Sequence, residues 1–203
     1  MNDYLSEVFG LLQTYGYTFL FLGVMLESVF LIGIIFPGIF IMIAGGFFAG
    51  IGELNIYYTL LIAFLGMLLG DNISFFLGRL EIIKMNRIKS ILKGKINIDK
   101  IINNSKGNLF IMFYHFPVYA RMVVPTILGN LNYSLKKWIL LNTIGTLIFT
   151  VTFILIGYFV GLQSKSIESA ISISSYIQLG FLIIFSIFIV LGILSFLKIF
   201  KKK

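Results

Sequence analysis

Long apolar stretches separated by short polar ones set the pattern of this chain. Residues 56–78 and 138–161 are each predominantly apolar and long enough for an α-helix to cross the roughly 30 Å hydrocarbon core of a bilayer. A third such stretch, residues 176–197, follows a polar loop at residues 163–175. The pattern predicts an all-α, polytopic membrane protein in which residues 1–203 form a single integral membrane domain.

A further apolar block, residues 17–52, is interrupted by Glu27 and by the Pro37-Gly38 pair. A regular helix does not pass a Pro-Gly pair unbroken. The block is therefore either a re-entrant hairpin or a helix followed by a half-helix, and the sequence leaves both open. Ahead of it, residues 1–14 have apolar positions at helical spacing, which is typical of an amphipathic helix on the membrane surface or of a simple helical lead-in.

Residues 109–130 form a second broken segment, and this one carries a permanent charge. Pro117, Pro125 and Gly129 would interrupt a regular helix, and Arg121 lies among them. A central arginine costs roughly 2.5–3.5 kcal/mol on membrane-insertion scales. Irregular backbone at membrane depth is tolerated only where it is buried in protein or lines a watery cavity. This segment is therefore the first candidate for a functional site.

Basic residues predict the orientation in the membrane. Residues 79–108 hold eight lysines and arginines against two acidic residues, and the chain ends in a cluster of lysines. Both features indicate the cytoplasmic side by the positive-inside rule. An even number of crossings must then separate them, and residues 138–161 and 176–197 already supply two. Residues 109–130 are therefore expected to enter and leave on the cytoplasmic side, as a re-entrant hairpin.

The first half of the chain then looks like an inverted copy of the second. In residues 17–78 a broken segment precedes a span, and in residues 109–161 the same order recurs. Two opposed broken segments that meet near the midplane are the architecture of many secondary transporters, in which the substrate binds at the interface between the repeats. We expect an inverted repeat of re-entrant hairpin plus transmembrane helix, with a further C-terminal transmembrane helix.

The amino-acid composition excludes several classes of functional site. The 203 residues are 59% hydrophobic and 12% charged, with no cysteine and one histidine. The absence of cysteine excludes disulfides, thiolate metal sites and cysteine nucleophiles, and a single histidine argues against a histidine metal site. The net charge of +8 indicates topology and contact with anionic lipids. It does not indicate nucleic acid, because the basic residues lack aromatic interleaving. We expect no metal and no cofactor other than a coupled proton.

An ordered set of motifs resembles a known family. The set comprises Glu27 ahead of Phe36-Pro37-Gly38, the small-residue run Ala44–Gly46, Gly70-Asp71 leading into Gly78-Arg79, Phe116, Arg121, Pro125 and Gly129, and a helix ending in Gly157-Tyr158 and Gly161. Over about residues 20–162 the chain resembles the DedA family, also called the VTT-domain or SNARE-associated family of membrane proteins.

The resemblance implies movement of lipids across the bilayer. The implied substrates are undecaprenyl phosphate and phospholipids such as phosphatidylethanolamine, with proton coupling in some members. It also implies that Glu27, an acid after the Pro-Gly pair and two arginines in the second broken segment are the functional charges. This chain departs from that pattern twice, with Ile39 in place of the acid and His115 in place of the first arginine. A histidine holds a phosphate only when it is protonated.

Each candidate residue has a functional and a structural interpretation. Arg121 is suited to gripping a phosphate with paired N–H donors, or it forms an internal ion pair with Glu27 or Asp71. Glu27 lies in apolar surroundings that favour its neutral form and suit proton exchange, or it is a static partner of Arg121. His115 is a second phosphate donor, a proton acceptor or a satisfied structural residue.

The remaining candidates are breaks and helix-end residues. Pro37-Gly38, with Pro125 and Gly129, would end half-helices whose N-termini favour anions, or they are packing kinks. Asp71 and Arg79 lie eight positions apart, on roughly one helical face. They either line a cytoplasmic exit or form a structural interface pair.

The leading hypothesis is a lipid transporter or scramblase of the cytoplasmic membrane, with no enzymatic activity. Arg121, with His115, would offset the phosphate charge, and Glu27 would couple a proton or reset the site. The chain has no P-loop motif for ATP, so transport would either be driven by a gradient or be passive. The alternatives are a proton-driven antiporter of small cations or drugs, and a membrane-embedded lipid phosphatase, which would need a nucleophile or metal cluster. The sequence leaves open the lipid, the direction and whether the protein works as a monomer or a homodimer.

Overall fold

The computed structural model describes residues 2–29, 38–83 and 107–163. Every regular element within these residues is a helix: α1 (Asn2–Ser28), α2 (Gly38–Gly50), α3 (Ile56–Arg79), α6 (Gly107–Phe113), α7 (Val118–Asn130) and α8 (Leu135–Gln163). The predicted all-α class is confirmed for this part of the chain. Pro37, residues 84–106 of the basic loop, the predicted last span at residues 176–197 and the C-terminal lysines lie outside the described residues.

The two predicted spans are helices of sufficient length. Helix α3 has 24 residues and helix α8 has 29, which gives lengths of about 36 and 43 Å at 1.5 Å per residue. Both are long and apolar enough to cross a membrane. Helix α3 begins where the sequence supplies a cap, because the side chain of Asn55 accepts hydrogen bonds from the backbone N–H groups of Tyr57 and Tyr58.

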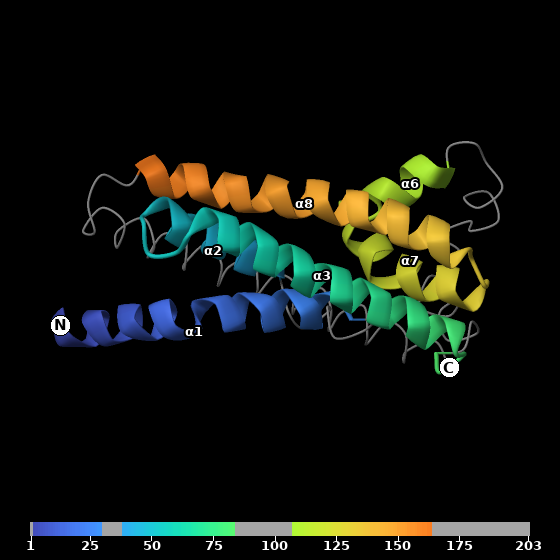
Figure 1. Ribbon diagram of the computed structural model, residues 1–203, viewed down its shortest axis with the longest axis horizontal. Helices are drawn as coiled ribbons and strands as arrows, with labels where there is room; N and C mark the ends of the chain where they lie inside the picture. The colour runs from blue at the N-terminus through green and yellow to red at the C-terminus, as the bar shows by residue number, and fades with distance from the viewer. Residues whose placement is uncertain (1, 30–37, 84–106, 164–203) are drawn as a thin grey trace, which may run out of the picture.

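Helices α2 and α7 are short and lie toward opposite ends of the molecule (Figure 1). Each has 13 residues, about 20 Å of helix, which is too short to cross the hydrocarbon core. Helix α2 packs on α8, and α7 packs on α3. In Figure 1, α1 ends and α2 begins near the middle of the long axis, and α7 also begins there. The starts of both short helices therefore lie in the interior of the bundle.

The N-terminal residues do not form a separate element. Helix α1 is continuous from Asn2 to Ser28, so residues 2–14 run without interruption into the first apolar segment. Of the two interpretations of this region, the structure has the helical lead-in.

The second broken segment differs from its prediction. The break falls at residues 114–117, and Pro117 is the N-cap residue of α7. Pro125 lies inside α7 and does not interrupt it, so the expectation that Pro125 ends a half-helix was wrong. Proline removes the hydrogen bond to the carbonyl four residues earlier, and its ring crowds that carbonyl. Helix α7 nevertheless continues through Pro125 while packed on α3, and Gly129 permits this packing. A Cβ atom at Gly129 would lie 2.0 Å from the carbonyl oxygen of Phe75.

Glycines set how closely the helices approach one another. Where α2 crosses α8, a Cβ added to Gly46, Gly50, Gly157 or Gly161 would lie 2.0–2.5 Å from a backbone oxygen of the facing helix. Both helices thus use two glycines four residues apart, the small-residue spacing common between membrane helices. These contacts fix α2 against α8 with no room for a side chain between their backbones.

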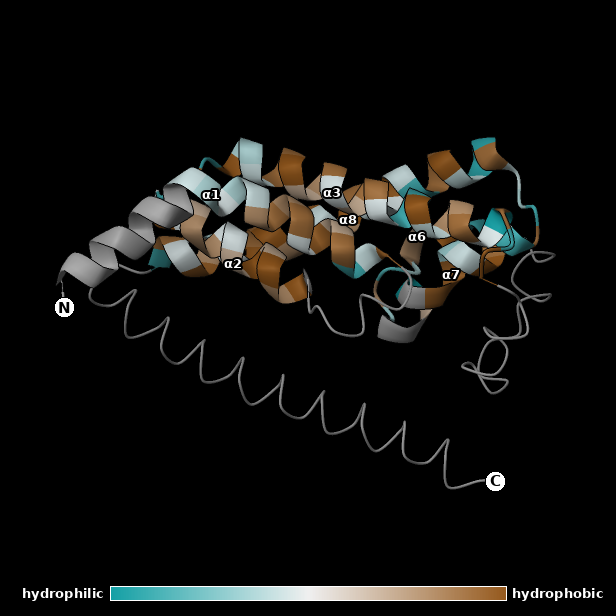
Figure 2. Cartoon of the chain, turned by 90° about the horizontal axis from the view of Figure 1, so that it is seen from below, coloured by the Kyte–Doolittle hydropathy of each residue, from teal (hydrophilic) through white to brown (hydrophobic). Residues whose placement is uncertain are grey.

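Much of the outer surface is apolar. Figure 2 shows hydrophobic residues along much of α2, α3 and α8, with hydrophilic residues gathered toward the helix ends. Helix α3 exposes a row of large side chains at helical spacing, namely Leu61, Leu65, Leu69, Ile73 and Phe76. An apolar face of this length is typical of contact with lipid, because soluble monomers expose only small apolar patches.

Candidate functional site

The apolar interior contains four buried charged or titratable side chains from distant parts of the sequence. Glu27 is 3% exposed, Arg121 5%, and Asp71 and His115 are both 0% exposed. Such groups are costly to bury unless they are paired and hydrogen-bonded. They form two pairs, Glu27 with Arg121 and Asp71 with His115.

The first pair joins α1 to α7. Glu27 lies in the last turn of α1, and Arg121 lies in the first turn of α7. The Nη2 group of Arg121 donates a hydrogen bond to Oε1 of Glu27. The guanidinium carbon of Arg121 lies 5.7 Å from the centre of the Phe149 ring, within the range of a cation–π contact.

Arg121 is only partly satisfied by this contact. Its Nε and Nη1 groups are buried and have no hydrogen-bond partner among the residues that the structure describes. A buried donor without a partner costs about 1–3 kcal/mol. The arginine therefore keeps donors available in the same plane as the one that binds Glu27.

The N-terminus of α7 adds to the positive potential around Arg121. Its cap residue, Pro117, makes no side-chain hydrogen bond to the first turn. The carbonyl oxygen of Pro117 accepts hydrogen bonds from the backbone N–H groups of Ala120 and Arg121. The remaining dipoles of the first turn favour a negative charge at this helix end. The guanidinium and the helix end thus each favour an anion.

The second pair lies in the middle of the bundle. His115, in the break between α6 and α7, places Nε2 3.0 Å from Oδ2 of Asp71 on α3. The hydroxyl oxygen of Thr146 on α8 lies 3.3 Å from both of these atoms. One turn earlier on α8, Oδ1 of Asn142 accepts a 2.8 Å hydrogen bond from the hydroxyl of Tyr114. Three separate parts of the chain therefore contribute to one polar network.

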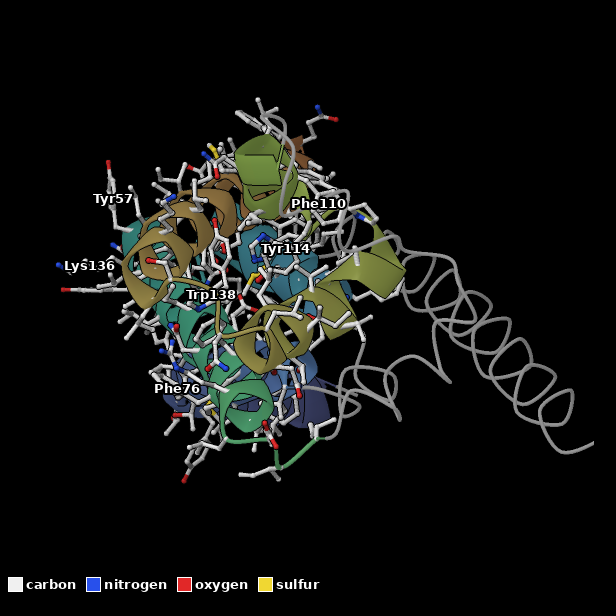
Figure 3. The ribbon with its side chains drawn as sticks, turned by 90° about the vertical axis from the view of Figure 1, so that its right-hand side faces the viewer. Tyr57, Phe76, Phe110, Tyr114, Lys136 and Trp138 are labelled. Atoms are coloured by element: carbon white, nitrogen blue, oxygen red, sulfur yellow. The ribbon has the colours of Figure 1, made fainter. Side chains whose placement is uncertain are left out.

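Aromatic rings enclose this network. The rings of Tyr114 and His115 lie 4.0 Å apart between centres, and Trp138 stacks on Phe75 at 4.9 Å. Figure 3 shows Tyr114 and Trp138 within the bundle, whereas Tyr57 and Lys136 point away from it. Phe149 lies 5.6 Å from the His115 ring and also contacts Arg121. One ring is therefore a neighbour of both ion pairs.

A sequence model of the VTT domain matches residues 36–159, a range that holds three of these four residues. The chain belongs to the VTT-domain, or DedA, family. The match begins just before α2 and ends within α8, so it covers more than half of the chain. The resemblance drawn from the ordered motifs is confirmed.

Several relatives of this VTT-domain protein are named as membrane proteins, whereas others have a different name. An uncharacterised membrane protein of Buchnera aphidicola subsp. Acyrthosiphon pisum is 31% identical over 201 residues, which cover 94% of this chain and 75% of that protein. The inner membrane protein YabI of Escherichia coli is 33% identical over 138 residues, covering 67% and 54%. A protein of Lactococcus lactis named alkaline phosphatase-like is 24% identical over 211 residues, covering 98% and 92%. No solved structure matches the chain.

The structure brings together some of the predicted residues and separates others. Glu27 and Arg121 meet, as one of the two interpretations of Arg121 required. His115 lies beside Asp71, and both are fully buried. The Nη1 group of Arg79 donates to the carbonyl oxygen of Tyr133 at 3.4 Å. Among the described residues Asp71 and Arg79 thus have separate partners and do not form the predicted pair, and their place at a cytoplasmic exit stays a prediction.

The structure gives the positions of two predicted glycines and of Ile39. Gly38 is the first residue of α2, and Gly129 lies at the crossing of α7 with α3. Ile39, at the position where the resemblance implies an acid, packs against the apolar cluster that contains Met67 and Phe149. At position 39 this chain thus has an apolar contact.

Sequence reasoning missed three members of the polar network. Tyr114, Asn142 and Thr146 are all buried, and none of them stood out against the apolar segments around them. Asn142 and Thr146 lie four residues apart within a membrane-length helix and so share one face. That spacing is the signal that could have identified them.

Proposed function

We propose that this VTT-domain protein moves a phosphate-bearing lipid across the cytoplasmic membrane, with Arg121 as the group that holds the phosphate. The observation that carries the proposal is the incomplete hydrogen bonding of Arg121. Two of its buried nitrogens have no partner in the described part of the chain, and Arg121 lies in the first turn of α7. A phosphate supplies the planar, multiple acceptors that a guanidinium binds most strongly.

The proposed architecture is an inverted repeat. In it, α1–α2 and α6–α7 are re-entrant hairpins from opposite sides of the membrane, and α3 and α8 are spans. The equal length of α2 and α7 and their starts near the middle support this arrangement. Inverted repeats of this kind place the substrate site near the midplane, the region where α7 carries Arg121.

The glycines of the two spans support the same proposal. Gly66 and Gly78 of α3 recur in α8 as Gly145 and Gly157, each 79 positions later. Their contacts correspond as well. Gly66 lies against α1 and Gly145 against α6, while Gly78 lies against α7 and Gly157 against α2. Each span thus contacts the first helix of its own repeat and the short helix of the other repeat.

The mechanism follows from an exchange of partners at Arg121. In the structure the carboxylate of Glu27 occupies one edge of the guanidinium. An arriving phosphate would bind the unpaired nitrogens and then displace Glu27, which would return when the head group leaves on the other side. The acyl or prenyl tail would stay in the bilayer, so only the head group needs a path through protein. This exchange avoids leaving either an anion or the arginine uncompensated in hydrocarbon.

The proposal also includes the orientation of the chain in the membrane. The basic residues 79–108 and the C-terminal lysines would face the cytoplasm, as the positive-inside rule requires. The second repeat would then begin on the cytoplasmic side and end on the outer side. With residues 176–197 as a further span, the chain would return to the cytoplasm at its C-terminal lysines.

Lipid movement in proteoliposomes tests the proposed function. Undecaprenyl phosphate and phosphatidylethanolamine would each be offered, with and without a pH gradient, to the wild type and to Arg121→Lys and Arg121→Ala. Charge-assisted hydrogen bonds contribute about 1.5–3 kcal/mol, so we expect roughly tenfold or greater loss of movement in both variants. Lys136→Ala is the matched control, because it removes a basic residue that is exposed on α8.

Each other outcome contradicts the proposal in a specific way. Unchanged lipid movement in correctly inserted Arg121→Ala protein would exclude Arg121 as the phosphate ligand. Flux of a soluble cation against protons without any lipid would favour the antiporter. Release of inorganic phosphate from the lipid would favour the activity suggested by the name of the Lactococcus lactis relative.

A further inference from the structure

The proposed exchange at Arg121 does not use the second buried pair. Asp71 and His115 are fully buried, and His115 is the single histidine of the chain. Histidine is the side chain whose charge changes in the physiological pH range. A fully buried histidine beside a carboxylate is therefore a group whose charge can change within the apolar interior.

The balance of buried charge depends on the state of His115. Glu27 and Asp71 are two buried carboxylates, and Arg121 is the permanent cation among these four side chains. With a neutral imidazole the four groups carry one net negative charge, and an anionic head group would raise that to two. With an imidazolium the four groups are neutral, and the same anion brings the net charge only to minus one. Protonated His115 therefore favours an anion at Arg121.

The geometry shows where the proton binds. Nε2 of His115 faces the Asp71 carboxylate at 3.0 Å, so in the neutral tautomer this nitrogen carries the hydrogen and donates it. Nδ1 is buried and has no hydrogen-bond partner among the described residues. It lies beside Gly145 on α8, where an added Cβ would come within 3.2 Å of it. An arriving proton would bind at Nδ1 and convert the pair from carboxylate with imidazole to carboxylate with imidazolium.

Every packed element contributes a defined group to this environment. Helix α3 supplies Asp71, and the segment that follows α6 supplies Tyr114, whose ring lies against that of His115. Helix α7 supplies Arg121, which also lies against the Phe149 ring, with Glu27 of α1 as its partner. Helix α8 contributes Asn142 and Thr146, which do not titrate. Asp71 stabilises the imidazolium, and the Arg121 cation opposes it.

We propose that the Asp71–His115 pair is a proton-binding site coupled to the occupancy of Arg121 by an anionic head group. The coupling rests on the proposed function; the proton site itself does not. An anion at Arg121 adds a negative charge to the Glu27–Arg121 pair and so favours a positive charge nearby, which means that binding of the anion promotes protonation of His115. By linkage, protonation of His115 tightens anion binding by the same factor. For unit charges on the order of 10 Å apart at an effective dielectric constant of 20, this factor is roughly tenfold.

Nitrogen NMR of the single histidine tests the proposal directly. Protein labelled with ¹⁵N-histidine, carrying no polyhistidine tag and held in phosphatidylcholine nanodiscs, would give one pair of imidazole signals that needs no assignment. We expect a reversible transition between neutral and charged imidazole as pH is varied between 5 and 9. Geranylgeranyl phosphate should move its midpoint to higher pH by about one unit, the pH equivalent of a tenfold change. Geranylgeraniol, which lacks the phosphate, should not move it.

Two comparisons complete the experiment. Asp71→Asn, which is isosteric, should move the midpoint to lower pH, and inorganic phosphate distinguishes a soluble anion from a lipid head group as the coupled ligand. A shift with inorganic phosphate equal to that with the lipid would overturn the lipid coupling. So would a midpoint that is the same with and without geranylgeranyl phosphate. An imidazole that stays in one state throughout would overturn the proton site itself. Lipid movement with an unchanged His115 signal would leave the proposed function intact and remove only this inference.

Discussion

The two buried ion pairs are buried to a similar extent but differ in position, charge and hydrogen bonding. Glu27–Arg121 joins the last turn of α1 to the first turn of α7, and its cation keeps two nitrogens without partners in the described residues. Asp71–His115 lies in mid-bundle, where Thr146 of α8 donates to Asp71 and the Tyr114 ring lies against that of His115. The first pair has a permanent cation with two unpartnered nitrogens among the described residues. The second is enclosed by neighbours on three parts of the chain, and we assign it a charge that changes with proton binding.

This difference indicates that the two pairs have separate roles. A group that must exchange one anionic partner for another needs available donors and a position at helix ends, where backbone dipoles help. A group that must change its charge without moving needs neighbours that hold its ring in place. The first pair has the permanent cation and the helix-end position that exchange requires, and the second has the enclosed ring that a change of charge in place requires. The predictions below test this comparison in order of decreasing effect.

The largest effect is expected when the Arg121 pair is broken on one side only. Arg121→Met leaves the Glu27 carboxylate buried without its cation, and loss of one partner from a buried pair costs about 3–5 kcal/mol. Glu27→Gln/Arg121→Met removes both charges and should recover most of that free energy of unfolding, yet lipid movement should stay absent. Unfolding in mixed micelles measures the stability. Recovery of lipid movement in the double variant would show that the pair is structural only.

This pair also shows how far the sequence alone could lead. The apolar runs predicted α3 and α8 to within a few residues, and the cost of an isolated arginine predicted a partner for Arg121, with Glu27 as one of two candidates. The choice between Glu27 and Asp71 could not be made. It depends on how α1 and α7, whose paired residues are 94 positions apart, approach one another in space. The rule that proline interrupts a helix also failed at Pro125, where α7 continues while packed on α3.

The second prediction compares the glycines that position each pair. A Cβ at Gly129 would meet the Phe75 oxygen at 2.0 Å, and one at Gly145 would meet the Met112 oxygen at 2.2 Å. Forcing such atoms into a packed crossing costs about 1–3 kcal/mol, so alanine at either site should destabilise the protein. Gly129→Ala moves the helix that carries Arg121, whereas Gly145→Ala crowds Nδ1 of His115. We therefore expect the second variant to disturb the His115 titration more than the first.

The control for both variants is Gly16→Ala in α1. Its added Cβ would lie 3.4 Å from a Leu54 methyl group, which is ordinary contact, and alanine is about 1 kcal/mol better than glycine in a helix. Thermal unfolding should place this variant at or above the wild type. Equal stability of all three alanine variants would contradict the close crossings.

A smaller effect is expected from removing one hydroxyl of the second pair. Thr146→Val keeps the shape of the side chain but removes its contacts with Asp71 and His115. The unsatisfied partners should cost about 1–3 kcal/mol. Thr152→Val is the matched control on the same helix, because among the described residues its hydroxyl bonds to the Ile148 carbonyl one turn earlier and to neither member of the pair. Unfolding free energies of the two variants should differ, while Arg121-dependent lipid binding should remain in both. A similar loss in the control would assign the effect to α8 as a whole.

The smallest structural change gives the sharpest distinction between the pairs. His115→Gln keeps a side-chain N–H that can donate to Asp71 but cannot take up a proton. If His115 is the coupled group, the pH dependence of lipid movement between pH 5.5 and 8.5 should flatten in this variant and persist in Thr152→Val. A pH dependence that survives in His115→Gln and disappears in Glu27→Gln would assign the proton to the first pair. In that case one pair would exchange both the phosphate and the proton, and the Asp71–His115 network would serve only to hold α3, α8 and the start of α7 together.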